Sequence, residues 1–461
     1  MKKIISLISL IKKIKITFFL VFVMFIIISL SSISGLELQS EKEKDKNNEK
    51  DKELKINSAM FFNKLLEVIP TENNIQPSTI NLDNKAYKIE YTLDFPLTKY
   101  INNLLSKYRP DYAAVVVIDN NTGKIISATG FRKVGNKIVP SLAFSNTNPC
   151  ASLFKIITAA DLLQEHRVNP ETIFTYVGKS TTLYNSQLKE RKNKQGRPQT
   201  FKKAFAVSNN VIFGKAALQY CSSKELYDMA YKFGFNQDLL DEIGLSRSIT
   251  ETPSMENNFV LASNRNLEQN AQNGLAALAS GFNTETKITP IHAAVLASIM
   301  ANDGILIYPS IISKVTDQDG GINLWKKIPR ESRVIDAKVA QELKEMMELT
   351  VDEGTARRSF RKLHPAFNNE LIIGGKSGSI TGGIPDGKRN WFIAFAIPKN
   401  PSLGKGISIS VMNVDIKGLR VKSAYLARNI IEFYFRGSLI GPQKITYGHK
   451  KHKLSKKVRK I

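Results

Sequence analysis

Cysteine and histidine are scarce in this 461-residue sequence, which contains only Cys150, Cys221 and five histidines. Two cysteines cannot form a disulfide scaffold, although one bridge between them could form in an oxidising compartment. Neither cysteine has the C-x-x-C spacing of a zinc site and the histidines are scattered, so the sequence predicts no metal site. We interpret both cysteines as small buried hydrophobic side chains rather than reactive thiols.

Acidic residues are also few, with 41 Asp and Glu against 66 Lys and Arg, which gives a net charge of +25. An excess of positive charge favours anionic lipid head groups, acidic wall polymers or nucleic acid as partners. The last segment, 441–461, is a basic tail, and after Lys450 it has almost no apolar content. It is interpreted either as a contact for an anionic lipid or wall polymer, or as a solvated tail that keeps the protein soluble.

A single long apolar run, 16–36, follows a basic segment at 1–15. It has roughly the 20 residues that span a bilayer, and the lysines on one side place the N-terminus in the cytoplasm. We therefore expect a single-pass anchor in the cytoplasmic membrane with the remaining chain on its outer face, where nucleic acid is not a partner. The alternative is a cleavable signal peptide, because Ser32 and Ser34 suit a signal peptidase.

The rest of the chain divides by composition and periodicity. Residues 37–90 begin with a run of Glu, Lys, Asp and Asn and are expected to form a charged flexible linker. Within 91–440, hydrophobic patterns predict strands at 113–118, 124–128, 371–380, 391–397 and 406–413. Helical patterns cover 152–164, 201–220, 223–233, 275–280, 290–302, 337–349 and 421–435. This order predicts an α+β fold: an antiparallel five-stranded sheet flanked by helices, with an additional mainly helical lobe.

The helix expected at 152–164 is apolar on nearly all sides, which is typical of a buried helix. Its polar start places Ser152 and Lys155 one turn apart on the same face. A desolvated lysine has a lowered pKa and can accept the proton of a serine that attacks a carbonyl. The same Ser-x-x-Lys spacing also begins at Ser9, Ser186, Ser359 and Ser402. Ser152 differs from these because it stands at the start of a helix expected to be buried.

Two further motifs follow in order, Ser208-Asn209-Asn210 and then Lys376-Ser377-Gly378 on an expected strand. Together with Ser152 and Lys155 they match the pattern S-x-x-K, S-D-N and K-T-G. The sequence thus resembles the transpeptidase domain of penicillin-binding proteins. The resemblance extends over about 91–439 and includes further segments similar to that family: 114–128, 288–293, 301–304, 353–356 and 390–398.

The resemblance implies roles for these residues. Ser152 would be acylated, Lys155 would be its base, and Ser208 would relay a proton to the leaving amine. The implied substrate-binding residues are Asn210, Lys376, Ser377, Gly378 and Ser379, of which Asn210 would bind the substrate amide and Lys376 and Ser377 its carboxylate. The backbone N–H groups of Ser152 and Ser379 would form the oxyanion hole, and Thr355 and Trp391 would be supporting residues.

The implied activity is that of a peptidoglycan D,D-transpeptidase or D,D-carboxypeptidase, which acts on stem peptides ending in D-Ala-D-Ala and is acylated by β-lactam antibiotics. It requires no cofactor. Some positions depart from the family pattern, because Ser377 replaces a usual Thr, Cys150-Ala151 precedes the nucleophile, and 281–283 replaces Gly-Gln-Gly. The short linker leaves no room for a glycosyltransferase domain or a full-sized pedestal module. The alternatives are a serine β-lactamase of the lysine-based type and a non-catalytic penicillin-binding sensor or scaffold.

Overall fold

A computed structural model describes residues 79–82, 85–189, 196–237, 239–240, 267–317, 323–326 and 329–441. Three segments discussed above lie wholly or almost wholly outside these residues: the expected basic segment 1–15, the expected anchor 16–36 and the basic tail. Within the described ranges, no helix is both long enough and apolar enough to cross a bilayer.

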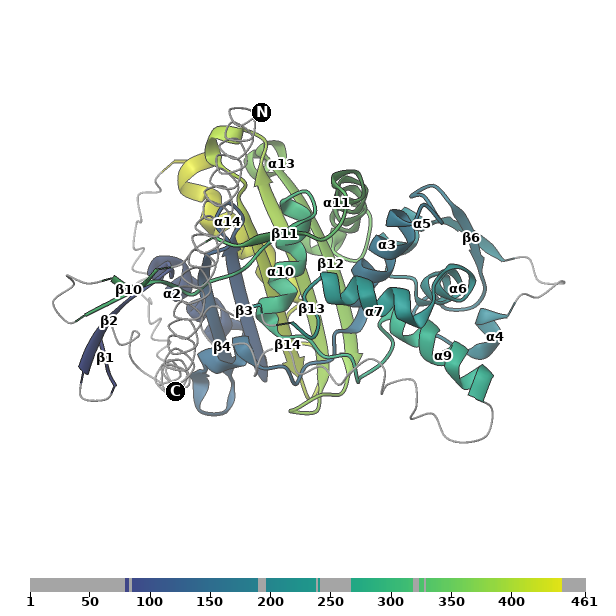
Figure 1. Ribbon diagram of the computed structural model, residues 1–461, viewed down its shortest axis with the longest axis horizontal. Coiled ribbons are helices and arrows are strands. Elements are labelled where there is room, and N and C mark those ends of the chain that lie inside the picture. The colour runs from purple at the N-terminus through teal and green to yellow at the C-terminus, as the bar shows by residue number, and fades with distance from the viewer. Residues whose placement is uncertain are drawn as a thin grey trace, which may run out of the picture. The chain divides into compact units, whose positions relative to one another are not determined.

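The main sheet has six antiparallel strands in the order β12-β13-β14-β3-β4-β5, and it forms the centre of Figure 1. The bounds are β3 Tyr112–Asp119, β4 Ile125–Arg132, β5 Lys137–Ile138, β12 Leu371–Thr381, β13 Lys388–Pro398 and β14 Ile407–Asp415. Segments from the two ends of the domain meet in the middle, where Val411 of β14 pairs with Val115 of β3. The edge strand β12 carries the third sequence motif.

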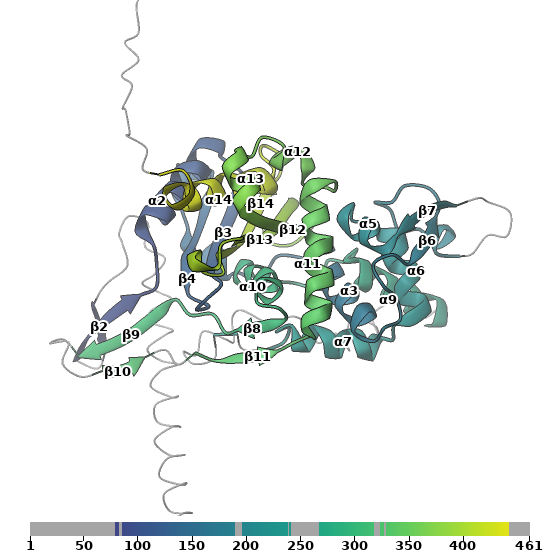
Figure 2. The ribbon, with the colours of Figure 1, turned by 90° about the horizontal axis from the view of Figure 1, so that it is seen from above.

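Helices cover both faces of this sheet, as Figure 2 shows. On one face lie α2 (Phe95–Tyr108) and α14 (Ser423–Leu439), which contribute Leu97, Leu105 and Ile430 to the core. On the other face lie α10 (Pro290–Ala301) and α11 (Ala337–Asp352). All twelve residues of α10 are buried, as expected for a helix that is apolar on every side.

The mainly helical lobe lies beside the β12 edge, at the right of Figure 1. Its elements are α3 Lys155–Gln164, β6 Ile173–Tyr176, α4 Asn185–Leu188, β7 Arg197–Thr200, α5 Phe201–Ala206, α6 Asn210–Tyr220, α7 Ser223–Lys232 and α9 Leu267–Ser280. The arrangement confirms the expected α+β class with flanking helices.

Three differences from the sequence-based expectations have local causes. The sheet has six strands instead of five, because the two-residue strand β5 pairs with β4 and is too short to show an alternating pattern. The helix expected at 201–220 is two helices, interrupted at Ser208, whose φ of 58° is not helical. The helix expected to begin at Ser152 starts as the 3₁₀ helix η3 (Ala151–Phe154) and becomes α-helical at Lys155.

Further short elements surround the main sheet. They are the 3₁₀ helices η1 Val134–Asn136, η2 Pro140–Phe144 and η5 Pro401–Leu403, the helices α12 Arg357–Phe360 and α13 Pro365–Glu370, and the pair β8 Ile305–Ile307 with β11 Glu331–Arg333. A separate four-stranded sheet has the order β1-β2-β9-β10. Its strands are β1 Thr79–Leu82, β2 Lys85–Tyr91, β9 Ile312–Asp317 and β10 Asn323–Lys326. The last part of the segment expected to be linker is thus paired, through β2, with a strand more than 200 residues later.

Candidate active site

Ser152 lies in η3, directly before the buried helix α3. The preceding residue, Ala151, has a φ of 52°, a strained value for a residue with a side chain. Gly281 packs against this turn so closely that an added Cβ would be 1.9 Å from the Ala151 oxygen. The end of α9 and the start of η3 therefore fix the backbone around Ser152 together.

Lys155 is fully buried, and its Nζ donates hydrogen bonds to three oxygens. The distances are 2.9 Å to Ser152 Oγ and 2.7 Å to Asn210 Oδ1, and the third acceptor is the Ser280 carbonyl. Burial lowers the pKa of Lys155 well below its usual value, and the charge of Lys376 lowers it further. Desolvation of this kind favours the neutral form of an amine, which can accept a proton.

The second motif occupies the turn between α5 and α6. Asn209 is the N-cap of α6, and its Oδ1 accepts a hydrogen bond from the Ile212 backbone N–H at 3.2 Å. With Asn209 in this position, Asn210 is free to accept from Lys155, while its Nδ2 donates to the Thr181 carbonyl at 3.0 Å. Ser208 lies on the other side of the cap and faces strand β12.

The third motif brings a second buried amine into the site. Lys376 Nζ donates to Ser208 Oγ at 2.9 Å and to the Ser377 carbonyl at 3.0 Å. Burial lowers the pKa of Lys376 to about 7. The hydroxyl of Ser377 is hydrogen-bonded to that of Thr355, with 2.6 Å between the two oxygens. Thr355, which the resemblance implies to be a supporting residue, therefore contacts the third motif directly.

Beyond Ser377, strand β12 passes close to the backbone of Ser152. A Cβ added to Gly378 would be 3.5 Å from the Ser152 backbone nitrogen, so a larger residue would narrow the gap between them. The next residue, Ser379, is exposed. Trp391 pairs with Gly378, is fully buried, and donates from Nε1 to the Pro149 carbonyl at 3.0 Å. Trp391 therefore packs beneath the site.

The ten candidate residues fall into linked groups. One group is Ser152, Lys155 and Asn210, a second is Ser208, Lys376, Ser377 and Thr355, and Gly378, Ser379 and Trp391 complete the β12 side. The charge of Lys376 lowers the pKa of Lys155, so the two amines are close enough to interact electrostatically.

Sequence reasoning missed two contributors. The Ser280 carbonyl accepts from Lys155, and a main-chain acceptor of this kind leaves no signature in residue type. Asn390 donates from Nδ2 to Ser379 Oγ at 3.1 Å and accepts at Oδ1 from the Ser423 N–H at 2.9 Å. A signal for Asn390 was available, because it directly precedes Trp391 in a segment already matched to the family.

The two cysteines are both free thiols, so the bridge considered from the sequence is absent. Cys150 is buried, as expected of a small hydrophobic residue, and burial raises the pKa of its thiol. Cys221 is partly buried and hydrogen-bonded to Asp161. Across the described ranges, no group of three or more His, Cys, Asp or Glu side chains is arranged to hold a metal ion.

Comparison with known proteins identifies the family. Residues 113–432, more than two thirds of the chain, match the penicillin-binding protein transpeptidase domain. The chain belongs to this family. It is 24% identical over 280 residues to the peptidoglycan D,D-transpeptidase PbpA of Mycolicibacterium smegmatis, a match that covers 58% of this chain and 50% of that protein. This penicillin-binding protein therefore spans about half the length of that curated relative.

Solved structures show the same fold at lower identity. Penicillin-binding protein 3 of Mycobacterium tuberculosis, complexed with aztreonam, matches with a TM-score of 0.57 and 18% identity, covering 76% of this chain and 79% of the other. A peptidoglycan synthetase of Bifidobacterium adolescentis gives a TM-score of 0.58 and 18% identity, covering 77% of this chain and 63% of the other. The expected penicillin-binding fold is thereby confirmed.

Proposed function

We propose that this protein is a peptidoglycan D,D-transpeptidase or D,D-carboxypeptidase that acts through an acyl-enzyme on Ser152. The observation that carries the proposal is the buried Lys155 amine, 2.9 Å from Ser152 Oγ and with a pKa lowered by burial. A hydroxyl next to such a base is an activated nucleophile. The named relative, a peptidoglycan D,D-transpeptidase, supports the choice of substrate class.

In the proposed reaction, neutral Lys155 takes the Ser152 hydroxyl proton while Oγ attacks the carbonyl carbon of the D-Ala-D-Ala bond. The resulting oxyanion accepts hydrogen bonds from the backbone N–H groups of Ser152 and Ser379. The intermediate collapses, the C–N bond breaks, and Ser208 relays to the leaving amine the proton that Lys155 took, which leaves Lys155 neutral again. The products of this half-reaction are an ester on Ser152 and free D-Ala.

Substrate binding is assigned to the β12 side and to Asn210. The carboxylate of the terminal D-Ala would contact Lys376 and the Ser377 hydroxyl, which Thr355 positions through its 2.6 Å contact. Asn210 Nδ2 would bind the substrate amide, and Gly378 leaves room for the donor peptide beside Ser152. The amine of a second stem peptide (transpeptidation) or water (carboxypeptidation) then attacks the ester, Lys155 takes a proton from this acceptor, and it returns that proton to Ser152 Oγ as the ester bond breaks.

Segments outside the described residues complete the proposal. The apolar run 16–36 would anchor the chain in the cytoplasmic membrane, with the catalytic domain on the outer face, and 441–461 would contact anionic lipid or a wall polymer. No metal or other cofactor is required, because a nucleophile, a base and an oxyanion hole are sufficient for acyl transfer to serine.

Intact-mass spectrometry of the full chain incubated with a labelled penicillin tests this proposal. We expect a stable adduct on Ser152 that is absent in Ser152→Ala. Rapid loss of the antibiotic without an adduct would instead identify a serine β-lactamase, because that class differs by fast deacylation. An intact antibiotic without an adduct would favour a non-catalytic sensor or scaffold.

A further inference from the structure

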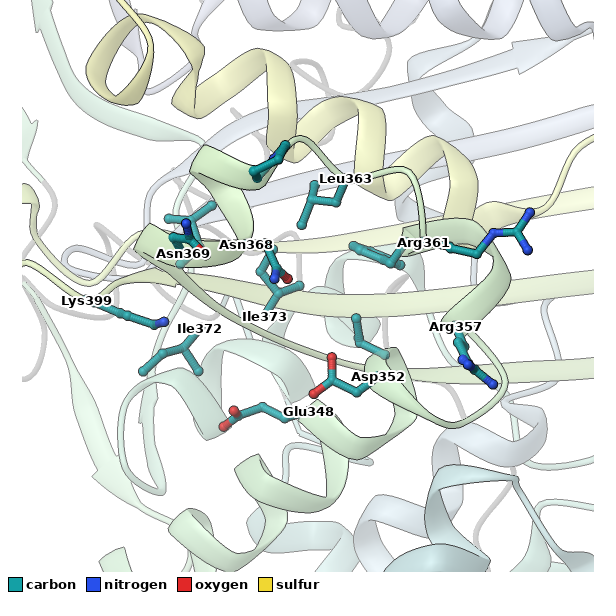
Figure 3. A pocket seen from close by; sticks show the side chains of 14 residues that line it. Glu348, Asp352, Arg357, Arg361, Leu363, Asn368, Asn369, Ile372, Ile373 and Lys399 are labelled. Carbon is teal, nitrogen blue, oxygen red and sulfur yellow. The ribbon is translucent and has the colours of Figure 1, made fainter.

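A second concave site lies outside the catalytic residues, and Figure 3 shows it from close by. It is a groove of about 670 Å³ between α11 on one side and α12 and α13 on the other, and the first residues of β12 line it as well. This volume falls within the range of about 300–1,000 Å³ that is usual for small-ligand sites. None of the ten candidate catalytic and binding residues lines it.

Five charged side chains surround this groove, which we call the α11–α12 groove: Glu348, Asp352, Arg357, Arg361 and Lys399. Within the described part of the chain, none of the five side chains has a hydrogen bond or ion pair. Charged neighbours just outside the groove do find partners, since Lys344 pairs with Asp303 at 2.7 Å and Glu353 with Lys203 at 2.6 Å. The five charged side chains of the groove are therefore available to a ligand.

The placement of these charges is locally unfavourable. Glu348 and Asp352 lie four residues apart on α11, where two like charges repel each other across one turn. They also lie near the C-terminus of the helix, where the helix dipole favours cations, and the last turn contains no basic residue. Burial raises the pKa of both carboxyl groups. Charged side chains that are placed against such local helix preferences are expected at functional sites.

The two signs of charge are separated along the groove. Figure 3 shows Glu348 and Asp352 on the α11 wall, with Arg357 and Arg361 at one end and Lys399 at the other. A ligand with only negative charges would face the two carboxylates, and one with only positive charges would face the three cations. The apolar side chains between them include Phe360, Leu363 and Ile372. The groove therefore suits a flexible ligand with an ammonium group, a carboxylate and an apolar stem.

We propose that the α11–α12 groove binds a peptidoglycan stem peptide that is not the one being acylated, with its ammonium on Glu348 and Asp352 and its carboxylate on Arg357 and Arg361. The choice of a stem peptide rests on the proposed function, because such peptides carry both groups. The segment between the two charged walls contains Thr355, which contacts Ser377 of the catalytic site. A peptide bound here would hold a neighbouring part of the wall beside the reacting one.

The test uses the full chain in detergent, first acylated at Ser152 with penicillin so that the catalytic cleft is blocked. The probe is a synthetic tripeptide with one lysine side chain and a free C-terminal carboxylate, but without D-Ala-D-Ala, measured by isothermal titration calorimetry. We expect saturable binding that Arg361→Glu weakens on the order of ten-fold, as expected for loss of a charge-assisted contact. The matched control, Lys362→Glu, reverses an exposed neighbouring charge outside the groove and should change the affinity by less than about two-fold.

A second probe, in which the lysine amine is acetylated, should bind several-fold more weakly, because Glu348 and Asp352 lose their partner. The inference is overturned if the acylated protein does not bind the first probe, or if Arg361→Glu and Lys362→Glu weaken binding equally. Equal binding of the acetylated probe would overturn the assignment of the ammonium. The penicillin adduct is weighed in the same samples, so a failure of this inference is distinguishable from a failure of the proposed acyl-enzyme.

Discussion

Lys376 of the edge strand β12 donates a hydrogen bond to Ser208 of the α5–α6 turn, with 2.9 Å between Nζ and Oγ. The bond joins the sheet to the helical lobe across 168 residues of sequence. Both partners belong to motifs that are recognisable in the sequence. The contact between them exists only because the lobe folds back onto the β12 edge.

The stability of the protein should depend on the protonation of Lys376. Its pKa is lowered from 10.5 to about 7 by burial, so between these values the unfolded chain binds more protons than the folded one. The free energy of unfolding should therefore rise with pH from about 7 to 10 and fall as the pH drops back toward 7. Urea denaturation at several pH values measures this slope.

Lys376→Met should lower that slope, because the variant retains only one of the two buried amines, Lys155. The exposed lysine Lys388 on the neighbouring strand provides the control, and Lys388→Met should keep the wild-type slope. Equal slopes in wild type and Lys376→Met would show that the amine is not desolvated.

Asn209 and Asn210 should have separable effects, although they are adjacent. Asn210→Ala removes the acceptor 2.7 Å from Lys155 Nζ, and we expect acylation by penicillin to slow by roughly ten-fold, as for loss of one hydrogen bond that positions the base. Asn209→Ala removes the cap of α6 and should lower the free energy of unfolding by about 1 kcal/mol. Stopped-flow acylation and denaturant unfolding on both variants separate the two, and an Asn209→Ala variant with the larger acylation defect would contradict the assignment.

Gly281 should not tolerate a side chain. Its φ is +64°, and an added Cβ would lie 1.9 Å from the Ala151 oxygen, next to the backbone of Ser152. Gly281→Ala is therefore expected to lower the free energy of unfolding by more than about 1 kcal/mol and to slow acylation as well. At Gly437 in α14 an added Cβ would have no atom within 4 Å, so Gly437→Ala should raise stability by about 0.5–1 kcal/mol. Thermal unfolding of the two variants should give shifts of opposite sign.

Thr355 should affect acylation more than stability. Thr355→Val keeps the shape of the side chain but removes the hydroxyl that contacts Ser377 Oγ at 2.6 Å. Loss of one such hydrogen bond predicts an acylation rate lower by about three- to ten-fold. Since Thr355 is exposed, the free energy of unfolding should change by less than about 0.5 kcal/mol. An unchanged rate would show that the Ser377 hydroxyl needs no support from Thr355.

The sequence alone determined the strands and helices whose patterns are strong and local. The alternating β-branched residues of β14 predict a strand, and the helix α3 is predicted to be buried because it is apolar on nearly all sides. Ser152, Lys155 and the two later motifs could be chosen because residue type and spacing carry their chemistry. The strand β5 was missed, since two residues are too few to form a pattern.

Only the tertiary structure decided how these motifs meet. Two buried amines, Lys155 and Lys376, have lowered pKa values because the lobe and the sheet close over them, and burial is a property of the whole fold. The break at Ser208, the carbonyl of Ser280 and the hydrogen bond of Asn390 to Ser379 depend on backbone positions that no residue type specifies. Residue identity sets which reactions are available, whereas distance and desolvation, which set the pKa values, arise only when segments far apart in sequence pack together.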